Sequence, residues 1–199
     1  TATVGGAAAG DSNDIVNCGK AVAVSGPYAT ALVSNNSASF HGNEIGIDVI
    51  GGSTTVTANA IYDNGIGIRV QQGAADIEAN TIDLNTTAGI VMLDGTVNVS
   101  DWNAVTTNAI GIQVSGGSAA IQSNDIRGNT TGGVLVDTTG TAVLSGNNIV
   151  GNTGYGVRND TVPAVSATNN WWGSYTGAGN TDAGGRTGEN FEAVGAKAR

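Results

Sequence analysis

Short apolar stretches separated by asparagine and glycine recur along the whole chain. Residues 59–70 read NAIYDNGIGIRV, and the same order of Asn, apolar residue, second Asn and Gly-apolar-x-apolar returns every 21 to 23 residues. Apolar and polar positions alternate within each unit, which is the period of a half-buried β-strand and not of an amphipathic helix. The pattern therefore predicts a succession of short strands joined by turns.

Three sets of positions share this period. The first Asn of each unit lies at Asn13, Asn36, Asn59, Asn80, Asn103, Asn124, Asn147 and Asn169. The second Asn lies at Asn43, Asn64, Asn85, Asn108, Asn129 and Asn152. Strands of the apolar-x-apolar type follow at residues 22–24, 47–49, 68–70, 90–92, 112–114 and 134–136. Repeats of this length are typical of solenoids, and the scarcity of Leu argues against a leucine-rich repeat. We predict an all-β fold, a single-stranded parallel β-helix (β-solenoid) of about eight rungs of 21–23 residues.

The stacking of rungs explains why the same residue types return. Rungs in such a coil lie about 4.8 Å apart, so each position of the repeat forms a column of equivalent residues. Inward columns of Val, Ile and Ala fill the core. Asn tolerates left-handed backbone angles, and its amide can hydrogen-bond the amide on the next rung. We therefore expect each Asn series to form a ladder along the rod.

Two further segments carry a family resemblance. Residues 4–18, VGGAAAGDSNDIVNC, resemble the opening rung of right-handed parallel β-helix proteins of the pectate-lyase-like superfamily, and residues 167–177, ATNNWWGSYTG, resemble their last rung. The resemblance covers about residues 4–177 and implies a right-handed coil of the secreted or surface bacterial type. That superfamily includes lyases, hydrolases, epimerases, adhesins, phage spikes and surface filaments, so the fold does not give the function.

The two ends of the repeat differ. We expect rungs over residues 1–177 and a capping tail over residues 178–199, with Trp171 and Trp172 closing the core and residues 190–194 adding a strand. Repeat-like sequence starts within a few residues of Thr1, without an amphipathic capping helix. Because solenoid ends are open sheet edges, the first rung is expected to stack either on preceding chain or on another molecule.

Charge and composition narrow the set of partners. The chain has 16 Asp and Glu against 7 Lys and Arg, a formal net charge of −9. Nucleic-acid binding needs clustered Lys and Arg, so nucleic acid is not an expected partner. No apolar run approaches the roughly 20 residues that cross a bilayer, so we expect no membrane insertion. The single Cys18 cannot form an internal disulfide, and the acidic, Asn/Thr-rich composition favours an extracellular or cell-surface location.

Two outward-facing pairs carry candidate chemistry. Asp48 and Arg69 are neighbours in one predicted column and resemble the carboxylate and basic residue of lyases in the superfamily; a cross-strand ion pair is the structural alternative. Glu78 and Asp101 each precede a ladder Asn by two residues and would form a Ca²⁺ site or an acid pair. Residues 97–103 fit the strand pattern only with a shift of one residue, so these carboxylates need not share a face. Apart from Ca²⁺, the sequence indicates no cofactor.

One rung contains an insertion. Seven residues instead of five separate Asn36 from Asn43, and this stretch contains Phe40 and His41. Functional loops occur at such places, although a tolerated surface insertion is the simpler interpretation. No Ser, Cys or carboxylate stands at a spacing that fixes a partner for His41. Trp102, like the other two Trp residues, is interpreted as a core filler or cap.

Three functions follow from these observations. The first is a non-catalytic extracellular structural or adhesive module that stacks end to end with copies of itself into a surface filament, or that contacts other surface proteins. The second is a polysaccharide lyase or hydrolase, acting on an acidic or neutral glycan through Glu78 with Asp101 or Asp48 with Arg69. The third is a passive glycan-binding module that uses the outer rows of Asn, Thr and Asp. The near-constant rung length favours the first.

Overall fold

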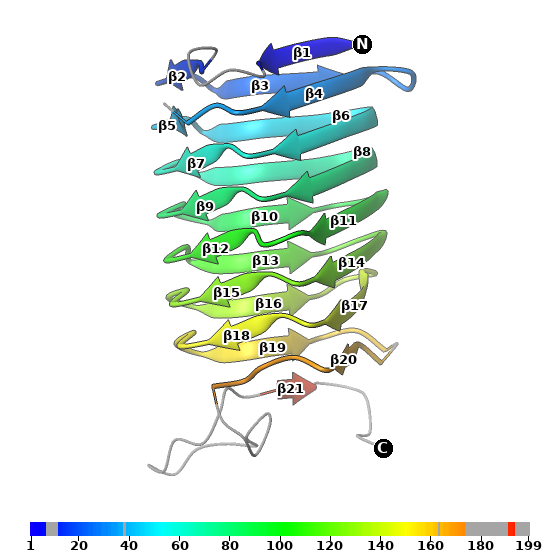
Figure 1. The fold of residues 1–199 in the computed structure, drawn as a ribbon. Helices are drawn as coiled ribbons and strands as arrows, with labels where there is room; N and C mark the ends of the chain where they lie inside the picture. Colours follow the sequence, from blue (N-terminus) through cyan, green and yellow to red (C-terminus); the bar gives the residue numbers. More distant parts are fainter. Residues whose placement is uncertain (7–11, 38, 163, 174–190, 194–199) are drawn as a thin grey trace.

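The chain winds into a coil of parallel strands stacked as a rod (Figure 1). The computed structural model describes residues 1–6, 12–37, 39–162, 164–173 and 191–193. The strands stack in about seven turns, as the seven-stranded sheet shows, close to the eight rungs expected. This confirms the predicted all-β parallel β-helix. Within the described residues, no helical segment has the length and apolar character needed to pass through a membrane.

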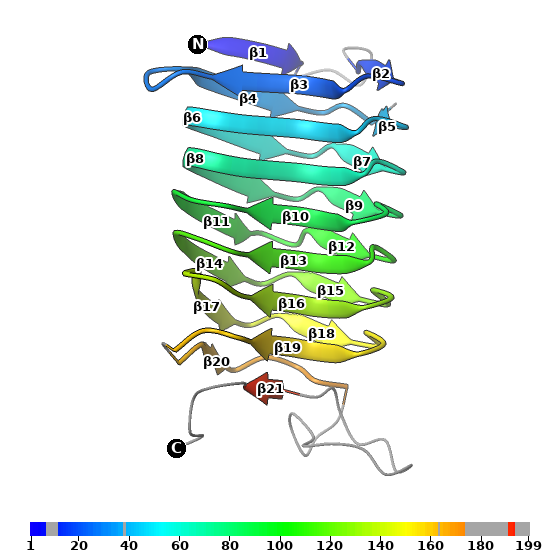
Figure 2. The same cartoon turned by 180° about the vertical axis from the view of Figure 1, so that it is seen from behind.

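Each full turn contributes a strand to three faces of the rod (Figures 1 and 2). The first face consists of β3 (Lys20–Ser25), the first halves of β6 (Ile45–Thr57) and β8 (Ile66–Glu78), β10 (Ala88–Met92), β13 (Ile110–Val114), β16 (Gly132–Val136), β19 (Tyr155–Asn159) and β21 (Phe191–Ala193). The second face consists of β1 (Ala2–Gly5), β4 (Thr30–Ser34), the second halves of β6 and β8, β11 (Thr96–Ser100), β14 (Ser118–Gln122), β17 (Thr141–Ser145) and β20 (Ser166–Thr168). The third face is the seven-stranded sheet of β2 (Asp14–Val16), β5 (Ser39–His41), β7 (Ala60–Tyr62), β9 (Thr81–Asp83), β12 (Ala104–Thr106), β15 (Asp125–Arg127) and β18 (Asn148–Val150). The first and second faces belong to one sheet because β6 and β8 bend from one into the other.

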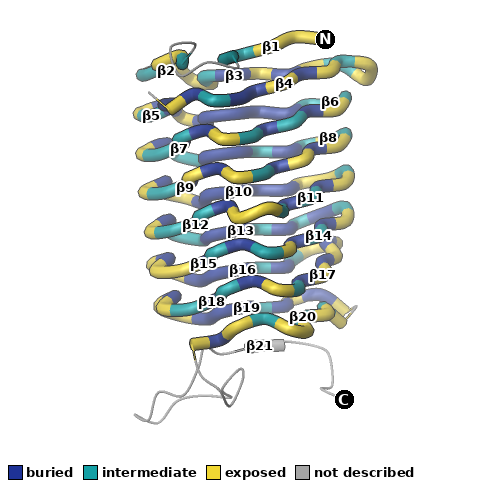
Figure 3. Tube along the Cα trace, in the orientation of Figure 1, coloured by how far each residue is buried: buried dark blue, intermediate teal, exposed yellow. Residues whose placement is uncertain are grey.

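The core is built from columns of identical position, as the repeat predicts. On the third face the inward column is Ile15, Phe40, Ile61, Ile82, Val105, Ile126 and Ile149. On the first face Ile47, Ile68, Ile90, Ile112, Val134 and Val157 stack in the same way. From Phe40 to Val157 these side chains are buried (Figure 3), and each contributes roughly 1.5–3 kcal/mol by leaving water. The hydrophobic driving force is therefore spread evenly along the rod.

Both Asn series form hydrogen-bonded ladders. Asn59 donates from its backbone N–H and from Nδ2 to Oδ1 of Asn80, both at 3.0 Å. In the second ladder Asn64 donates to Oδ1 of Asn85 at 3.0 and 3.1 Å. Nδ2 of Asn59 also reaches the carbonyl oxygen of Val33 on the preceding rung at 2.9 Å. One amide thus satisfies buried groups on three consecutive rungs, where an unpaired group would cost about 1–3 kcal/mol.

The last position of the first ladder differs from the prediction. The sequence pattern assigns Asn169 to it, but Asn147 donates from N and Nδ2 to Oδ1 of Asn170, at 3.0 and 2.8 Å. Asn169 has a φ of 60° and is the turn residue before the ladder position, the place that Ala79 and Ser123 occupy in earlier rungs. Because two Asn residues are adjacent here, the sequence offers two equivalent choices, and the geometry of the turn selects the second.

The bend between the first and second faces depends on glycine. Gly73 has a φ of +93°, and a Cβ atom there would lie 2.4 Å from the carbonyl oxygen of Gly52 on the preceding rung. A side chain would therefore meet both a left-handed backbone and a backbone clash. With glycine at the bend, β6 and β8 pair on both sides of it, although their register shifts there.

The two ends of the rod are built differently. β1, β2 and β3 lie at one end (Figure 1), and each pairs with one neighbouring strand among the described residues. At the other end Trp172 packs in the core cluster, whereas Trp171 is 42% exposed and bridges Asn148 through its backbone. Of the residues 178–199 expected to form a capping tail, the structure describes 191–193, which pair with β19 as a strand.

Candidate functional site

The most highly connected charged group lies on the outward side of the first face. Asp48 accepts hydrogen bonds from Nε and Nη2 of Arg69, both at 2.9 Å, and from Nε2 of Gln71 at 3.1 Å. Nζ of Lys20 lies 2.6 Å from its Oδ2. Although Asp48 belongs to an outward column, its side chain is fully buried beneath these partners. The predicted column neighbours Asp48 and Arg69 are therefore in direct contact.

The electrostatics of this cluster fix the charge state of the carboxylate. Burial by itself raises the pKa of Asp48, but the hydrogen bonds from Arg69, Lys20 and Gln71 outweigh it, so the pKa lies below its ordinary value. The hydrogen bond to Asp48 raises the pKa of Arg69. Asp48 is thus an ionised acceptor with donors on both oxygens, and Arg69 is held in its charged form. This arrangement joins three rungs and leaves neither group poised to take up a proton.

The second predicted pair does not assemble. Glu78 is aligned with Thr57 on one side and with Ser100 on the other, so Asp101 is not its column neighbour. Asp101 has a φ of 55° and lies in the turn beyond the strand. The turn from Ser100 to the ladder residue contains one residue more than the equivalent turn after Glu78, which displaces Asp101 from the sheet. Glu78 and Asp101 are therefore not neighbours in one column, the outcome that the one-residue shift of residues 97–103 left open.

The third face contains a cluster that the sequence did not reveal. Nε2 of His41 lies 3.3 Å from Oδ1 of Asp14 on the preceding rung, and its ring stacks on Tyr62 of the following rung, with centroids 5.1 Å apart. Ser39 donates to the hydroxyl oxygen of Tyr62 at 3.1 Å, and its φ of 118° is a conformation that L residues rarely adopt. Ser39 is completely buried, so its hydroxyl is not presented to solvent as a nucleophile. The cluster ties β2, β5 and β7 together.

The insertion explains why this cluster escaped prediction. The extra residues 37 and 38 precede β5, whereas Phe40 and His41 stand in ordinary strand positions opposite Ile61 and Tyr62. Phe40 is a core residue and not part of an exposed loop. Once those two residues are set aside, Asp14, His41 and Tyr62 fall on successive rungs. The repeat therefore does predict that these three residues lie near one another, but the two extra residues after Asn36 hid their alignment.

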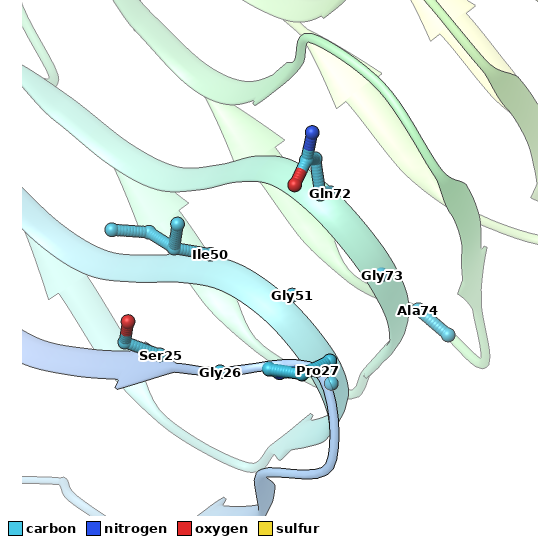
Figure 4. Close-up of a pocket in the computed structure, with 9 residues that line it drawn as sticks. Ser25, Gly26, Pro27, Ile50, Gly51, Gln72, Gly73 and Ala74 are labelled. Atoms are coloured by element: carbon cyan, nitrogen blue, oxygen red, sulfur yellow. The ribbon is translucent and has the colours of Figure 1, made fainter.

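A shallow depression of about 550 Å³ lies where the first face bends into the second (Figure 4). Ser25, Ile50 and Gln72 are aligned on successive rungs of β3, β6 and β8. The rest of the lining is Gly26, Pro27, Gly51, Gly52, Gly73 and Ala74. The lining therefore offers one hydroxyl, one amide and backbone groups to a ligand, and no carboxylate, imidazole or amine.

Trp102 occupies an unexpected position. Its side chain is 78% exposed, and its φ of 65° follows the left-handed φ of Asp101. It is the extra residue of the turn between β11 and β12, while Asn103 stays buried in the ladder. The interpretation of Trp102 as a core filler is therefore wrong, because the extra residue is accommodated by an outward bulge.

Comparison with known protein families identifies the same fold as the geometry does. A family model described as a right handed beta helix region matches residues 5–123, more than half of the 199-residue chain. The chain belongs to the right-handed β-helix family. No curated protein and no solved structure matches it. The family membership confirms the resemblance seen in the sequence, including the hand of the coil.

The right-handed β-helix supports side-chain clusters but does not prescribe their chemistry. Within the described ranges, no three His, Cys, Asp or Glu side chains gather in a way that could hold a metal ion. Asp83 follows Tyr62 in the outward column of the third face, and burial raises the pKa of its carboxyl group. The clusters at Asp48 and His41 both act between rungs, which is where a β-helix is held together.

Proposed function

We propose that this β-helix is a non-catalytic structural module of an extracellular or cell-surface protein, a rigid rod that extends by stacking copies end to end. The carrying observation is the parallel pairing of equivalent strands from rung to rung along the rod, which a second copy can continue. Among the described residues, β1, β2 and β3 each pair on one side (Figure 1). Open strand edges are templates for strand addition, and a second copy offers strands of matching spacing at its opposite end.

The polarity of the Asn ladder supports head-to-tail contact. Every ladder Asn donates toward the following rung, so the first member, Asn13, presents an Oδ1 to which none of the described residues donates. Asn170 is the last ladder member among the described residues, and its Oδ1 accepts two hydrogen bonds from Asn147. Because the members donate in one direction, the ladder is polar, and its two ends are complementary. Such a contact is heterologous and does not close, which gives an open fibre.

The state of the charged clusters favours a passive role. The oxygens of Asp48 are occupied by Arg69, Lys20 and Gln71, and His41 is engaged with Asp14 and Tyr62. These side chains stabilise contacts between rungs. A rod whose polar groups serve its own stacking suits a load-bearing or spacing element.

The proposal is tested by negative-stain electron microscopy and sedimentation velocity over a wide range of concentration, with and without Ca²⁺. We expect the wild-type chain to form thin fibres or multiples of one rod length. Asn13→Ala removes the acceptor to which no described residue donates and should shift the distribution toward single rods. Gln122→Ala, an exposed amide in the middle of the second face, is the matched control and should assemble as the wild type does.

Two results would overturn the proposal. One is a wild-type chain that sediments as single rods at every concentration. The other is assembly that Asn13→Ala and Gln122→Ala affect equally, since the contact would then lie away from the ladder end.

A further inference from the structure

The turn between β11 and β12 is the place where the second face departs from its repeat. The neighbouring turns pass from strand to ladder through one left-handed residue, Ala79 (φ 52°) or Ser123 (φ 57°). Here the chain uses two, Asp101 and Trp102. The bulge is nonetheless integrated, because Trp102 donates its backbone N–H to the carbonyl oxygen of Ser123 at 2.9 Å. Asp101 in turn accepts from the backbone N–H of Ala79 at 3.0 Å.

Holding an indole in this position has an energetic cost. A left-handed backbone costs a non-glycine residue roughly 1–2 kcal/mol, and the large apolar surface of Trp102 is left in water instead of in the core. The equivalent turns show that Ala or Ser satisfies the fold at this position. Backbone strain combined with an exposed aromatic side chain is the combination from which a contact function can be inferred.

The strands beside Trp102 contain outward residues that are exposed or half-buried (Figure 3), and several of these carry hydrogen-bonding groups. In the outward column nearest the turn, Glu78 on β8 is aligned with Ser100 on β11, and Gln122 on β14 is aligned with Ser145 on β17. In the next outward column Asp76 is aligned with Asn98. Columns of this kind recur about every 4.8 Å along the rod, so the side chains offer donors and acceptors at a constant spacing next to one apolar platform.

Charge selects the kind of ligand. Asp76, Glu78 and Asp101 give this surface a negative potential. The described basic side chains lie on other faces: Lys20, Arg69 and Arg158 on the first face and Arg127 on the third. A polyanion would therefore be repelled, whereas a neutral sugar chain carries hydroxyl groups that carboxylates and amides can bind. The C–H groups of a sugar ring carry partial positive charge and fit the negative face of an indole ring.

We propose that Trp102, with the outward polar side chains Asp76, Glu78, Asn98 and Ser100, forms a binding site for a neutral glycan. Trp102 supplies the stacking platform, and the two outward columns orient the sugar hydroxyl groups. The site lies on the side of the rod, away from both ends, so it goes beyond the proposed end-to-end assembly and does not depend on it. Copies stacked in a fibre would repeat the site at the length of one rod.

The test is titration of the intact chain with neutral gluco-, manno-, xylo- and galacto-oligosaccharides of six units, with oligogalacturonate as the anionic control. Binding is measured by calorimetry and by tryptophan emission, which should shift to shorter wavelength as Trp102 is covered. We expect at least one neutral oligosaccharide to bind and Trp102→Ala to weaken it at least tenfold. Trp102→Phe should retain part of the affinity, because a smaller aromatic face remains.

Two controls separate the site from other effects. Tyr28→Ala removes an aromatic side chain that is 95% exposed on another turn and should leave binding unchanged. Asn98→Ala should weaken binding without changing the emission of the free chain. The thermal unfolding midpoint of each variant shows that the fold is intact.

Three outcomes would overturn the proposal. They are binding of none of the neutral oligosaccharides, binding of oligogalacturonate in preference to them, and loss of self-association in Trp102→Ala, which would make Trp102 a protein contact. The oligosaccharide titrations and the emission shift do not depend on end-to-end assembly, so they stand even if that assembly fails.

Discussion

Arg69 on β8 donates hydrogen bonds to both carboxylate oxygens of Asp48 on β6, with Nε–Oδ1 and Nη2–Oδ2 distances of 2.9 Å each. The bidentate geometry is the strongest form of an Arg–carboxylate contact. With Lys20 on β3 as a further partner, one buried carboxylate connects three successive rungs. Outward columns of a β-helix can thus carry interactions as specific as those of its core.

Replacing that carboxylate should weaken the fold measurably. Asp48→Asn keeps the shape of the side chain but removes its charge. Arg69 and Lys20 then lose their anionic partner and must be hydrated by water instead. We expect a loss of about 2 kcal/mol in the free energy of unfolding, below the full cost of breaking a buried pair because both cations are partly exposed. Urea denaturation measures it, and Asp76→Asn on the exposed second face should change stability by less than about 0.5 kcal/mol. Equal effects of the two substitutions would contradict this account.

The same carboxylate should make stability sensitive to acid. Because the pKa of Asp48 is lower in the folded chain than its ordinary value of 3.8, the unfolded chain takes up the proton first as the pH falls. The stabilisation is complete above 3.8 and is lost as the pH drops through the lowered folded value. The difference in unfolding free energy between wild type and Asp48→Asn should therefore be constant near neutral pH and shrink in acid. A difference that widens in acid would have the wrong sign.

Asp83 should respond in the opposite direction. Burial raises its pKa, so the folded chain binds this proton more tightly than the unfolded chain, and the charged form weakens the fold above the raised pKa. Asp83→Asn should raise the thermal midpoint at neutral pH, and the gain should disappear on acidification. Thermal unfolding at several pH values measures it. A variant that is less stable than wild type at neutral pH would show that the carboxylate has a favourable partner.

The Asn ladder should be most sensitive in its middle. Asn80 accepts two hydrogen bonds from Asn59 and donates to Asn103, and it is buried. Asn80→Ala leaves several buried groups without partners and should cost about 3 kcal/mol of stability. Asn13→Ala at the exposed end should cost less than about 1 kcal/mol. Denaturation midpoints of the two variants give the comparison, and similar losses would mean that the ladder is not cooperative.

Cys18 stands at the position of the second ladder where an Asn would continue it. Its backbone N–H donates to Oδ1 of Asn43 at 2.9 Å, as each ladder Asn does, but its side chain reaches only the carbonyl oxygen of Val16, with Sγ at 3.3 Å. Cys18→Asn should add the missing amide contacts and raise stability by about 1 kcal/mol. Cys18→Ser, whose hydroxyl is too short to reach both acceptors, is the control. No gain over the Ser variant would show that the first rung is too loosely held to support the ladder.

The period of the sequence by itself determined the architecture. Residues 59–70 show why: a strand of period two, an Asn that bends the chain and a Gly that permits close approach define one rung, and translation by one rung defines the rod. The pairing of Asp48 with Arg69 follows from the same translation, because residues one period apart must lie side by side. In a repeat fold most contacts join equivalent positions of neighbouring rungs, so the local preferences of one rung and the global fold favour the same structure.

Only the tertiary structure decided the places where the period is broken. One extra residue before Asn103 removed Asp101 from the column of Glu78 and placed Trp102 in solvent, and two extra residues before β5 concealed the contact of His41 with Asp14. A repeat gives the average rung, but it does not say whether an extra residue bulges outward from the turn or shifts the strand. That choice depends on which arrangement keeps the ladder and the core columns in register, and it is settled by contacts between rungs that the linear sequence does not contain.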